Sequence, residues 1–324
     1  MTTTTTTTKP VALVVGASRG IGRQIAIDLA KNGYTGTQPP QTSPNNRRQN
    51  HLQPGHHNPL PPDPNSPEST ISTVAREITS AGGTAYPIAV DVRFVPQIEH
   101  LVRETVRLGG GRLDVLVYNS GAIWWSSVAN TRTKRFQLMQ KVNPEGLYAT
   151  VQAALPVFER NGWRGRIVVV SPPIYSRFFR GKTGYAIGKV GMSVLTRGLA
   201  MDFVRQGAKD MAITSIWPAT AVESAATERN PANVDSRANL RKPTIFSDAI
   251  LGILNTPAHV VNGLLALDED FLRQYCGVTD FSKYAVVPGT SPRRMVPKEL
   301  PVLEVAEQDD EGVRMDSAKG RSKL

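Results

Sequence analysis

The feature that most constrains the fold of this chain is its opening, where a strand, a glycine turn and a helix follow one another. Residues 11–15 read VALVV, a short continuous apolar run that is typical of a strand buried on both faces. The turn after it supplies Gly16, Gly20 and Gly22, and a helical pattern begins at once. Because glycine has no β-carbon, such a turn predicts a backbone that a phosphate group can approach closely at the start of the helix.

The rest of the chain repeats this alternation of apolar strands and amphipathic helices. Strands that alternate with helices form parallel sheets with helices on both faces. We therefore expect an α/β fold of the Rossmann type, a doubly wound parallel sheet, over residues 10–290. Helices are predicted over 69–83, 96–111, 131–160, 185–204 and 244–255, and strands over 84–92, 113–121, 165–171, 211–218 and 262–270.

The alternation fails at residues 36–68, where the second strand is due. This segment is rich in proline, and its large aliphatic side chains are only Leu52 and Leu60, so it can neither form a central strand nor bury a core. The second strand is predicted to be missing or truncated, and the segment to be a long solvated insertion. Three histidines of the insertion lack the cysteines and rigid frame of a metal site, so no metal is predicted: His51, His56 and His57.

Charge and cysteine content favour an ordinary intracellular protein. The formal net charge is +11, and nucleic-acid binding is one interpretation of that excess. The basic residues are scattered and form no nucleic-acid recognition module, so a basic soluble enzyme is favoured and no nucleic-acid partner is predicted. The single cysteine, Cys276, cannot build an internal disulfide framework. No apolar run reaches the length of a membrane span.

Both ends of the chain are predicted to lie outside the folded domain. Residues 1–9 are a threonine-rich tail that is expected to be disordered, and residues 291–324 are a polar tail that is expected to be flexible. The chain ends in Ser322, Lys323 and Leu324, a tripeptide that the peroxisomal import receptor reads as an address. The sequence therefore predicts this receptor as a partner and the peroxisomal matrix as the location; a chance ending is the alternative.

Four residues in the middle of the chain form a recognisable catalytic set. Tyr185 and Lys189 lie one helical turn apart on a shared face, and Ser171 ends a predicted strand at the edge where such sheets bind ligands. Asn143 lies in the long helical stretch before that strand. In this order and with the glycine turn, the set resembles the Asn, Ser, Tyr-x3-Lys tetrad of the short-chain dehydrogenase/reductases. A surface pair on a helix is the alternative for the tyrosine and lysine.

The resemblance implies a nicotinamide cofactor and the residues that hold it. Tyr118-Asn119-Ser120-Gly121 is similar to the family's Asn-Asn-Ala-Gly element, with Tyr118 in place of the first asparagine. In the family, a basic residue at the position of Arg19 accompanies NADP, so NADP(H) is favoured over NAD(H). The implied cofactor-binding residues are Gly16, Ala17, Ser18, Arg19, Gly20, Ile21, Gly22, Asp91, Val92, Asn119, Gly121, Tyr185 and Lys189.

The tetrad implies oxidoreductase chemistry between an alcohol and a carbonyl. A tyrosine has an ordinary pKa of about 10, and a nearby ammonium from Lys189 is predicted to lower the pKa of Tyr185 toward working pH. Ser171 is predicted to donate a hydrogen bond to the substrate oxygen, and Asn143, by the resemblance, to hold a water in the proton relay. The resemblance also implies that Lys189 binds the nicotinamide ribose.

The predicted loss of the second strand leaves a second reading open. In the family, that strand ends at the residue that selects NAD or NADP. The sheet could close up with a weakened cofactor site, residues 33–38 could form a stunted strand, or the chain could be a compromised isoform or a misassembled coding sequence. The alternative function is therefore a catalytically silent protein of the same fold that binds its cofactor weakly.

Further motifs bear on the substrate. The stretches SPPIYSRFF, SIWPATAVESAA and DFSKYAVVPG resemble a peroxisomal branch of the family whose animal members carry a carboxy-terminal sterol-carrier domain, a domain this chain is expected to lack. Trp124 and Trp125 follow the predicted strand over 113–121, and they either line an apolar substrate pocket or only pack. A lipid-like or acyl substrate is predicted, and a homo-oligomer is expected by analogy. The loop with Arg177, Phe178, Phe179, Arg180 and Lys182 either meets an anionic acyl thioester or is simply solvated.

Overall fold

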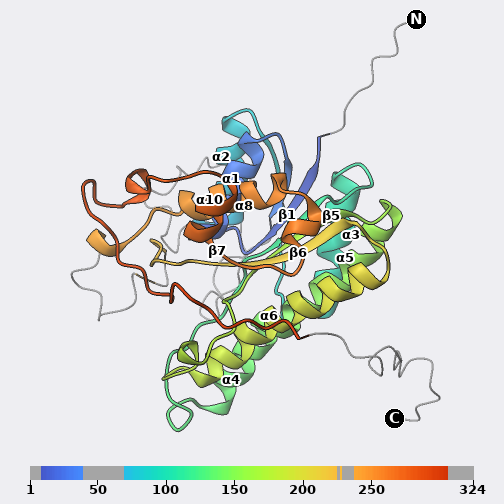
Figure 1. The fold of residues 1–324 in the computed structure, drawn as a ribbon. Helices are drawn as coiled ribbons and strands as arrows, with labels where there is room; N and C mark the ends of the chain where they lie inside the picture. The colour runs from blue at the N-terminus through green and yellow to red at the C-terminus, as the bar shows by residue number, and fades with distance from the viewer. Residues whose placement is uncertain (1–8, 39–68, 225–226, 228–236, 306–324) are drawn as a thin grey trace, which may run out of the picture.

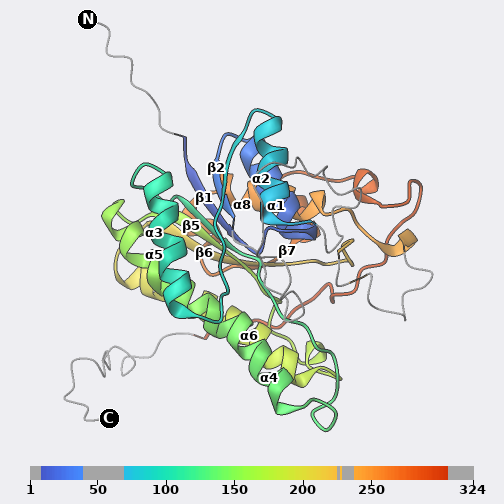
Figure 2. The ribbon, with the colours of Figure 1, turned by 180° about the vertical axis from the view of Figure 1, so that it is seen from behind.

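A computed structural model describes residues 9–38, 69–224, 227 and 237–305 of the chain. These residues form a seven-stranded parallel sheet in the order β3-β2-β1-β4-β5-β6-β7, with helices on both faces (Figures 1 and 2). The predicted doubly wound sheet is confirmed. The strands are β1 Val11–Val15, β2 Thr35–Gln38, β3 Thr84–Pro87, β4 Val115–Tyr118, β5 Arg164–Val170, β6 Asp210–Trp217 and β7 Leu265–Leu267.

The helices of the described residues follow the predicted ranges closely. They are α1 Gly20–Lys31, α2 Ile71–Ser80, α3 Val95–Leu108, α4 Thr133–Gln140, α5 Gly146–Arg160, α6 Thr183–Arg205, α8 Thr244–Asn255, α9 Ala258–Val261 and α10 Asp268–Tyr275. Short helical turns are η1 Lys141–Glu145, which is a π-helix, and the 3-10 turns η2 Ser176–Phe178, η4 Arg237–Asn239 and η5 Ser282–Tyr284. Among these helices, none is long and apolar enough to cross a membrane.

Two apolar cores lie on the two faces of the sheet, because side chains of a strand alternate in direction. On β1, Ala12 and Val14 belong to one core and Leu13 and Val15 to the other. Helices α1, α2, α8 and α10 cover the first face, and α3, α5 and α6 cover the second (Figures 1 and 2). The carboxyl ends of the strands therefore meet at one edge, where the catalytic candidates are found.

The second strand is present as Thr35–Gln38, which corrects the prediction that it is missing; it is as long as β3 and β4. Residues 35–38 pair in parallel with β1 on one side and with β3 on the other, so the predicted insertion begins after residue 38 rather than at 36. The residues that would follow this strand and select NAD or NADP fall in 39–68, outside the described residues. The three histidines of the predicted insertion lie there too.

The polar sequence Thr-Gly-Thr-Gln can form an internal strand because its buried hydroxyl finds partners. Thr37 is fully buried, and its hydroxyl donates to the Ala12 carbonyl at 3.4 Å while accepting from the Thr105 hydroxyl at 3.1 Å. A buried polar group that is hydrogen-bonded in this way avoids most of its desolvation cost. Apolar patterning alone therefore missed a strand whose stability comes from its main-chain pairing.

Several boundaries differ from the sequence expectation. Within the described residues, the strand predicted over 84–92 pairs at Thr84–Pro87. Of the strand predicted over 262–270, Leu265–Leu267 form β7, and Asp268 begins α10. At the other end of the domain, residues 291–305 lie along the domain beyond the predicted limit of 290. Arg294 pairs with Asp270 at 2.6 Å, and the backbone of Met295 donates to the Ala219 carbonyl at 2.8 Å.

Candidate active site

The glycine turn after β1 has the shape of a phosphate cradle. Gly16 and Gly20 adopt φ angles of +91° and +55°, which side-chain-bearing residues rarely adopt. A β-carbon on Gly22 would lie 2.1 Å from the Gly16 carbonyl oxygen, so helix α1 can start this close to the turn only with glycine there. Arg19, at the N-cap of α1, makes no side-chain capping hydrogen bond. The first backbone N–H groups of α1 thus fit the pyrophosphate of a dinucleotide.

The residues beside the cradle hold it in place. Asn119 follows β4 and donates from its side-chain amide to the Gly16 carbonyl at 2.9 Å. Ser120 lies so close that a β-carbon on Gly16 would contact its backbone nitrogen at 2.8 Å. The predicted cofactor residues of the turn and of β4 therefore meet at one place, which is the carboxyl edge of β1 and β4. Ala17 and Ser18 of the turn are buried, and Ile21 is half-buried.

Asp91 and Val92, two of the predicted cofactor-binding residues, lie in the loop between β3 and α3. The side chain of Val92 is buried and belongs to the core between the sheet and α3. The carboxylate of Asp91 accepts hydrogen bonds from Arg93, including one from its Nε at 2.8 Å. The backbone N–H of Asp91 donates to the Gln97 side chain at 2.8 Å. The arginine and glutamine fix the loop, and the carboxylate faces a guanidinium of its own chain.

Tyr118, which replaces the family's first asparagine, is a buried side chain that connects β4 to the π-helical turn. It is fully buried at the end of β4, and its hydroxyl donates to the Val142 carbonyl at 2.6 Å. A β-carbon on Gly146 would lie 2.5 Å from that hydroxyl, so the phenol fills the space that glycine leaves. Burial raises the pKa of Tyr118. Its hydroxyl therefore stays protonated and neutral, and it links β4 to the π-helical turn through a hydrogen bond.

Asn143 lies in that π-helical turn, which interrupts the helical stretch predicted as continuous. It is fully buried. Its amide oxygen accepts from the Ala122 backbone at 2.9 Å, and its amide nitrogen donates to the Ala122 carbonyl at 3.1 Å. Such turns often occur at functional sites. The side chain thus holds the loop after β4 through one donor and one acceptor, and its second amide N–H stays available for a water in the proton relay.

Lys189 and Ser193 of α6 tie that helix to the loop on either side of Ser171. The Lys189 ammonium donates to the Val170 carbonyl at 2.8 Å, and the Ser193 hydroxyl donates to the Pro172 carbonyl at 2.6 Å. Both donors are buried. Ser171 therefore lies between two fixed carbonyls, and the position of its hydroxyl is set by α6, the helix that carries Tyr185. Sequence reasoning missed Ser193, whose only signal was its spacing of four residues from Lys189.

The Ser171 hydroxyl is buried, and it has no hydrogen-bond partner among the described residues. Burying such a group without a partner costs roughly 1–3 kcal/mol. A hydroxyl without a partner at the carboxyl end of a strand is therefore suited to donate a hydrogen bond to a substrate oxygen.

Lys189 and Asn143 both lie beside Gly121, which is in the loop after β4. A β-carbon on Gly121 would lie 3.3 Å from the lysine Nζ and 3.5 Å from the asparagine Oδ1.

Tyr185 lies on α6 within an aromatic wall, and its titration differs from the prediction. Its side chain is 2% exposed, and its ring lies 6.2 Å from the rings of both Trp125 and Phe178. Burial raises the pKa of Tyr185, whereas the sequence predicted that Lys189 lowers it. The reason is that the lysine ammonium points to the Val170 carbonyl, and burial in apolar surroundings disfavours the phenolate. The phenol is a proton donor at neutral pH.

Lys189 itself makes the stability of the fold depend on pH. Burial lowers the pKa of Lys189 from 10.5 to about 7. Between about pH 7 and pH 10.5 the unfolded chain carries a proton on this lysine that the folded chain has lost. The free energy of unfolding therefore rises as pH increases through this range, and below it the buried charge destabilises the fold to the full extent. Lys189→Met removes this dependence. In chemical denaturation at pH 6.5 and pH 9, we expect wild type to gain relative to the variant at the higher pH; a constant difference would contradict the assignment.

The apolar wall contains one residue that sequence reasoning missed. Trp217 ends β6, and its ring lies 5.8 Å from Phe178 at 88° and 5.7 Å from the Lys189 ammonium. Its position at the carboxyl end of a strand was the signal that could have identified it. Trp124 and Trp125 follow β4 and are 40% and 48% exposed, so they border the wall on its solvent side rather than fill a core.

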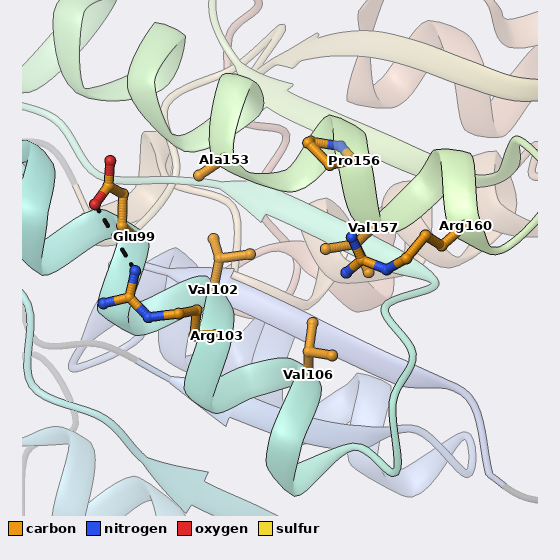
Figure 3. A pocket seen from close by; sticks show the side chains of 8 residues that line it. All are labelled: Glu99, Val102, Arg103, Val106, Ala153, Pro156, Val157 and Arg160. Carbon is orange, nitrogen blue, oxygen red and sulfur yellow. Dashed lines mark ion pairs between the residues drawn. The ribbon is translucent and has the colours of Figure 1, made fainter.

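A separate groove lies between α3 and α5 (Figure 3). Its volume is about 320 Å³, and an ion pair between Glu99 and Arg103 at 3.7 Å lies at its edge. None of the catalytic or cofactor candidates lines it. Its walls come from Glu99, Val102, Arg103, Val106, Ala153, Pro156, Val157 and Arg160.

Comparisons with known proteins point in one direction. A family profile described as enoyl-(acyl carrier protein) reductase matches residues 65–263. Hydroxysteroid dehydrogenase-like protein 2 of Mus musculus is 35% identical over 281 residues, which is 85% of this chain and 51% of that protein. The chain thus spans about half the length of this curated relative. This is the branch whose stretches the sequence resembles.

Two solved structures match over nearly their whole length. A short-chain dehydrogenase from Mycobacterium thermoresistibile is 31% identical with a TM-score of 0.73, and the match covers 88% of this chain and 94% of that one. A candidate dehydrogenase from Xanthomonas campestris is 33% identical with a TM-score of 0.73, covering 92% and 98% of the two chains. Sequence and fold therefore agree on a single family.

Proposed function

Since this chain belongs to the short-chain dehydrogenase/reductase family, we propose that it is an oxidoreductase that interconverts an alcohol and a carbonyl, with Tyr185 as proton donor and acceptor. The observation that carries the proposal is the orphaned, buried hydroxyl of Ser171. It lies between two carbonyls that the helix of Tyr185 holds in place. This arrangement serves a bound oxygen atom, because the hydroxyl lies at the carboxyl end of β5, whereas the unpartnered hydroxyl of Ser215 lies within β6.

Each residue has a role that its chemistry supports. A nicotinamide cofactor, when bound, supplies or accepts the hydride. Ser171 donates a hydrogen bond to the substrate oxygen, and the neutral phenol of Tyr185 gives its proton to the alkoxide that develops there. Lys189 fixes the position of Ser171 by donating to the neighbouring Val170 carbonyl, and its proposed further role is to bind the nicotinamide ribose. In the opposite direction the phenol must first lose its proton, so oxidation is favoured at higher pH than reduction.

The cofactor is proposed to be NADP(H) in preference to NAD(H), held by the glycine turn. Arg19 supports this choice because it stands at the N-cap of α1, next to the proposed pyrophosphate site. A guanidinium suits the 2′-phosphate that distinguishes NADP from NAD. The substrate is proposed to be lipid-like or acyl, because the aromatic rings around the catalytic pair form an apolar wall. The rings of Trp125 and Phe178 flank Tyr185, and the ring of Trp217 lies next to Phe178 and Lys189.

Titration of the purified full chain with NADPH and with NADH, followed by nicotinamide fluorescence, tests the cofactor proposal. Saturable binding with the tighter constant for NADPH is expected, and turnover of at least one member of a panel of long-chain ketones should follow. Saturable binding without any turnover would favour a catalytically silent protein that keeps the fold. The silent alternative was based on the absence of the second strand, and the presence of β2 makes it less well supported. An absence of binding by either cofactor would overturn the proposal.

A homo-oligomer is proposed through an exposed apolar stripe on α6. Ile187, Val194 and Met201 recur every seven residues along this 23-residue helix, and they are 54%, 58% and 47% exposed. A stripe of this spacing is typical of helix pairing. We expect Val194→Glu to shift the mass measured by light scattering toward one chain, while Lys209→Glu, outside the stripe, leaves it unchanged. An equal mass for both variants and wild type would contradict the stripe as the interface.

Import into the peroxisomal matrix is proposed through Ser322, Lys323 and Leu324, which lie outside the described residues. The support is the tripeptide itself, which acts as a receptor-read address when it ends a chain. We expect a fluorescent protein fused in front of residues 306–324 to enter peroxisomes. The same fusion without the last three residues should stay outside. Equal distribution of the two fusions would refute the address.

A further inference from the structure

The two segments that build the active site carry positive charge and no negative charge. Residues 115–144 contain four basic residues and no aspartate or glutamate, and residues 171–201 contain five basic residues and again no acidic ones. The first segment supplies the loop with Trp125 and Asn143, and the second supplies Ser171, Tyr185 and Lys189. The positive charge of these two segments therefore favours an anionic ligand at this site.

Lys182 is the cation of this set, outside the tetrad, whose ammonium lies over the two rings that flank Tyr185. It is half-buried directly before α6, three residues from Tyr185. Its ammonium lies 4.1 Å from the centre of the Phe178 ring and 5.5 Å from that of Trp125. These are the two rings that flank Tyr185 at 6.2 Å. The lysine and the phenol therefore share one aromatic wall.

Lys182 is partly desolvated, and no carboxylate of the described residues pairs with it. Burial lowers the pKa of Lys182, with no acidic group acting in the other direction. A lysine that served only to cover apolar surface would extend its stem and place its ammonium in water. The ammonium of Lys182 instead lies over the rings of Trp125 and Phe178, in surroundings of low polarity that screen its charge weakly. Such a charge is strongly attracted to an anion that enters the same wall.

The other cations of the region are placed differently. Arg177 and Arg180 of the same loop are exposed, so solvent and salt screen them. The guanidinium of Arg135 lies 5.0 Å over Trp124, which is farther out on the rim. Of the loop that the sequence singled out, Lys182 alone lies against the wall around Tyr185, and the two arginines provide matched controls.

We propose that Lys182 binds an anionic group of the substrate, so that the enzyme acts on an anionic amphiphile, a long-chain alcohol or ketone that also carries a carboxylate or a phosphate. This inference rests on the proposed function for the identity of the reacting group, and it adds the chemistry of the substrate beyond that group. The apolar wall holds the chain of the amphiphile, and the ammonium fixes its charged end relative to the phenol. Lys182 is thereby a specificity-determining residue.

Calorimetric titration of the full chain with three ligands of one chain length tests the proposal without any turnover. The probes are decanoate, decyl phosphate and decanol, used below their micellar concentrations. Wild type should bind at least one of the two anions about tenfold more tightly than the alcohol, as a charge-assisted contact implies. The tighter of the two anions distinguishes a carboxylate from a phosphate.

Variants assign the preference to one side chain. Lys182→Met keeps the length of the stem, so it should reduce the anion preference to less than about twofold and leave decanol binding unchanged. Lys182→Arg should retain the preference, and Arg177→Met and Arg180→Met should retain it as well. Unchanged anion preference in Lys182→Met, or the same loss for decanol as for the anions, would overturn the proposal. If Lys182→Met fails to fold, Lys182→Gln is judged by the same criteria.

The result is separable from that of the proposed function. A wild type that prefers the anions but oxidises no NADPH with any ketone keeps the anion site and loses the reductase assignment. A wild type that reduces ketones but binds decanoate, decyl phosphate and decanol equally loses the anion site and keeps the reductase assignment.

Discussion

The Tyr185→Phe variant is expected to lose about 10²- to 10⁴-fold in kcat for ketone reduction, because it lacks the proton that the alkoxide takes up. The phenol is 2% exposed and packs between Trp125 and Phe178, and phenylalanine keeps that packing. We therefore expect NADPH affinity, measured by fluorescence, and the free energy of unfolding to change little. Steady-state kinetics over pH 6–9 measure the loss, and the residual activity should no longer depend on the ionisation of this group.

Tyr175→Phe is the matched control for this variant. Tyr175 belongs to the same aromatic cluster, with its ring 6.0 Å from that of Phe178, and its pKa is also raised by burial. Its hydroxyl has no role in the proposed chemistry, so its removal should leave kcat within about threefold of wild type. Comparable losses in the two variants would mean that the cluster acts through packing, and the assignment of Tyr185 would be wrong.

The Gly22→Ala variant is expected to abolish cofactor binding and to destabilise the fold. Its new β-carbon would lie 2.1 Å from the Gly16 carbonyl oxygen and 2.5 Å from the Asn119 amide nitrogen. The first of these contacts is with backbone and cannot be relieved by a side-chain rotation. The turn must open, which costs on the order of 3 kcal/mol and separates the backbone N–H groups that the phosphates need. Denaturant unfolding and NADPH titration measure the two effects.

Gly198→Ala provides the control, because an alanine there meets nothing within 4 Å and the backbone angle is not positive. Gly198 lies in the exposed part of α6, between Val194 and Met201 of the proposed stripe, so light scattering must first show that the variant keeps the mass of wild type. An alanine in that position should stabilise the chain by roughly 0.5–1 kcal/mol, since glycine weakens a helix interior. A Gly22→Ala variant that bound NADPH like wild type would remove the glycine turn from the cofactor site.

The sequence predicted the layers of the fold well where strands were apolar, and less well where hydrogen bonds replaced apolar burial. β1, β4 and the second half of β5 (residues 167–170) read as continuous apolar runs, and each of these strands lies inside the sheet. β2 has no such pattern, because the buried hydroxyl of Thr37 is satisfied by Ala12 and Thr105. Those partners are 25 and 68 residues away in sequence, so no local pattern could reveal them.

The candidate site shows the same division. Spacing alone placed Tyr185 and Lys189 on one face of a helix, and the end of a strand placed Ser171 at the ligand edge. The roles of their neighbours depended on contacts across the fold. The hydroxyl of Tyr118 meets the Val142 carbonyl, and the Lys189 ammonium meets the Val170 carbonyl rather than the phenol. The raised pKa of Tyr185 follows from this geometry and could not be read from residue spacing.

A crystal structure of the full chain with NADP(H) tests the central claim most directly, namely that the phenol of Tyr185 and the hydroxyl of Ser171 face one reaction site beside the glycine turn. We predict the pyrophosphate at the first backbone N–H groups of α1, and the nicotinamide ring on the Ser171 side of the aromatic wall, within contact of Tyr185. A nicotinamide bound elsewhere, or no bound cofactor at saturating concentration, would contradict the account.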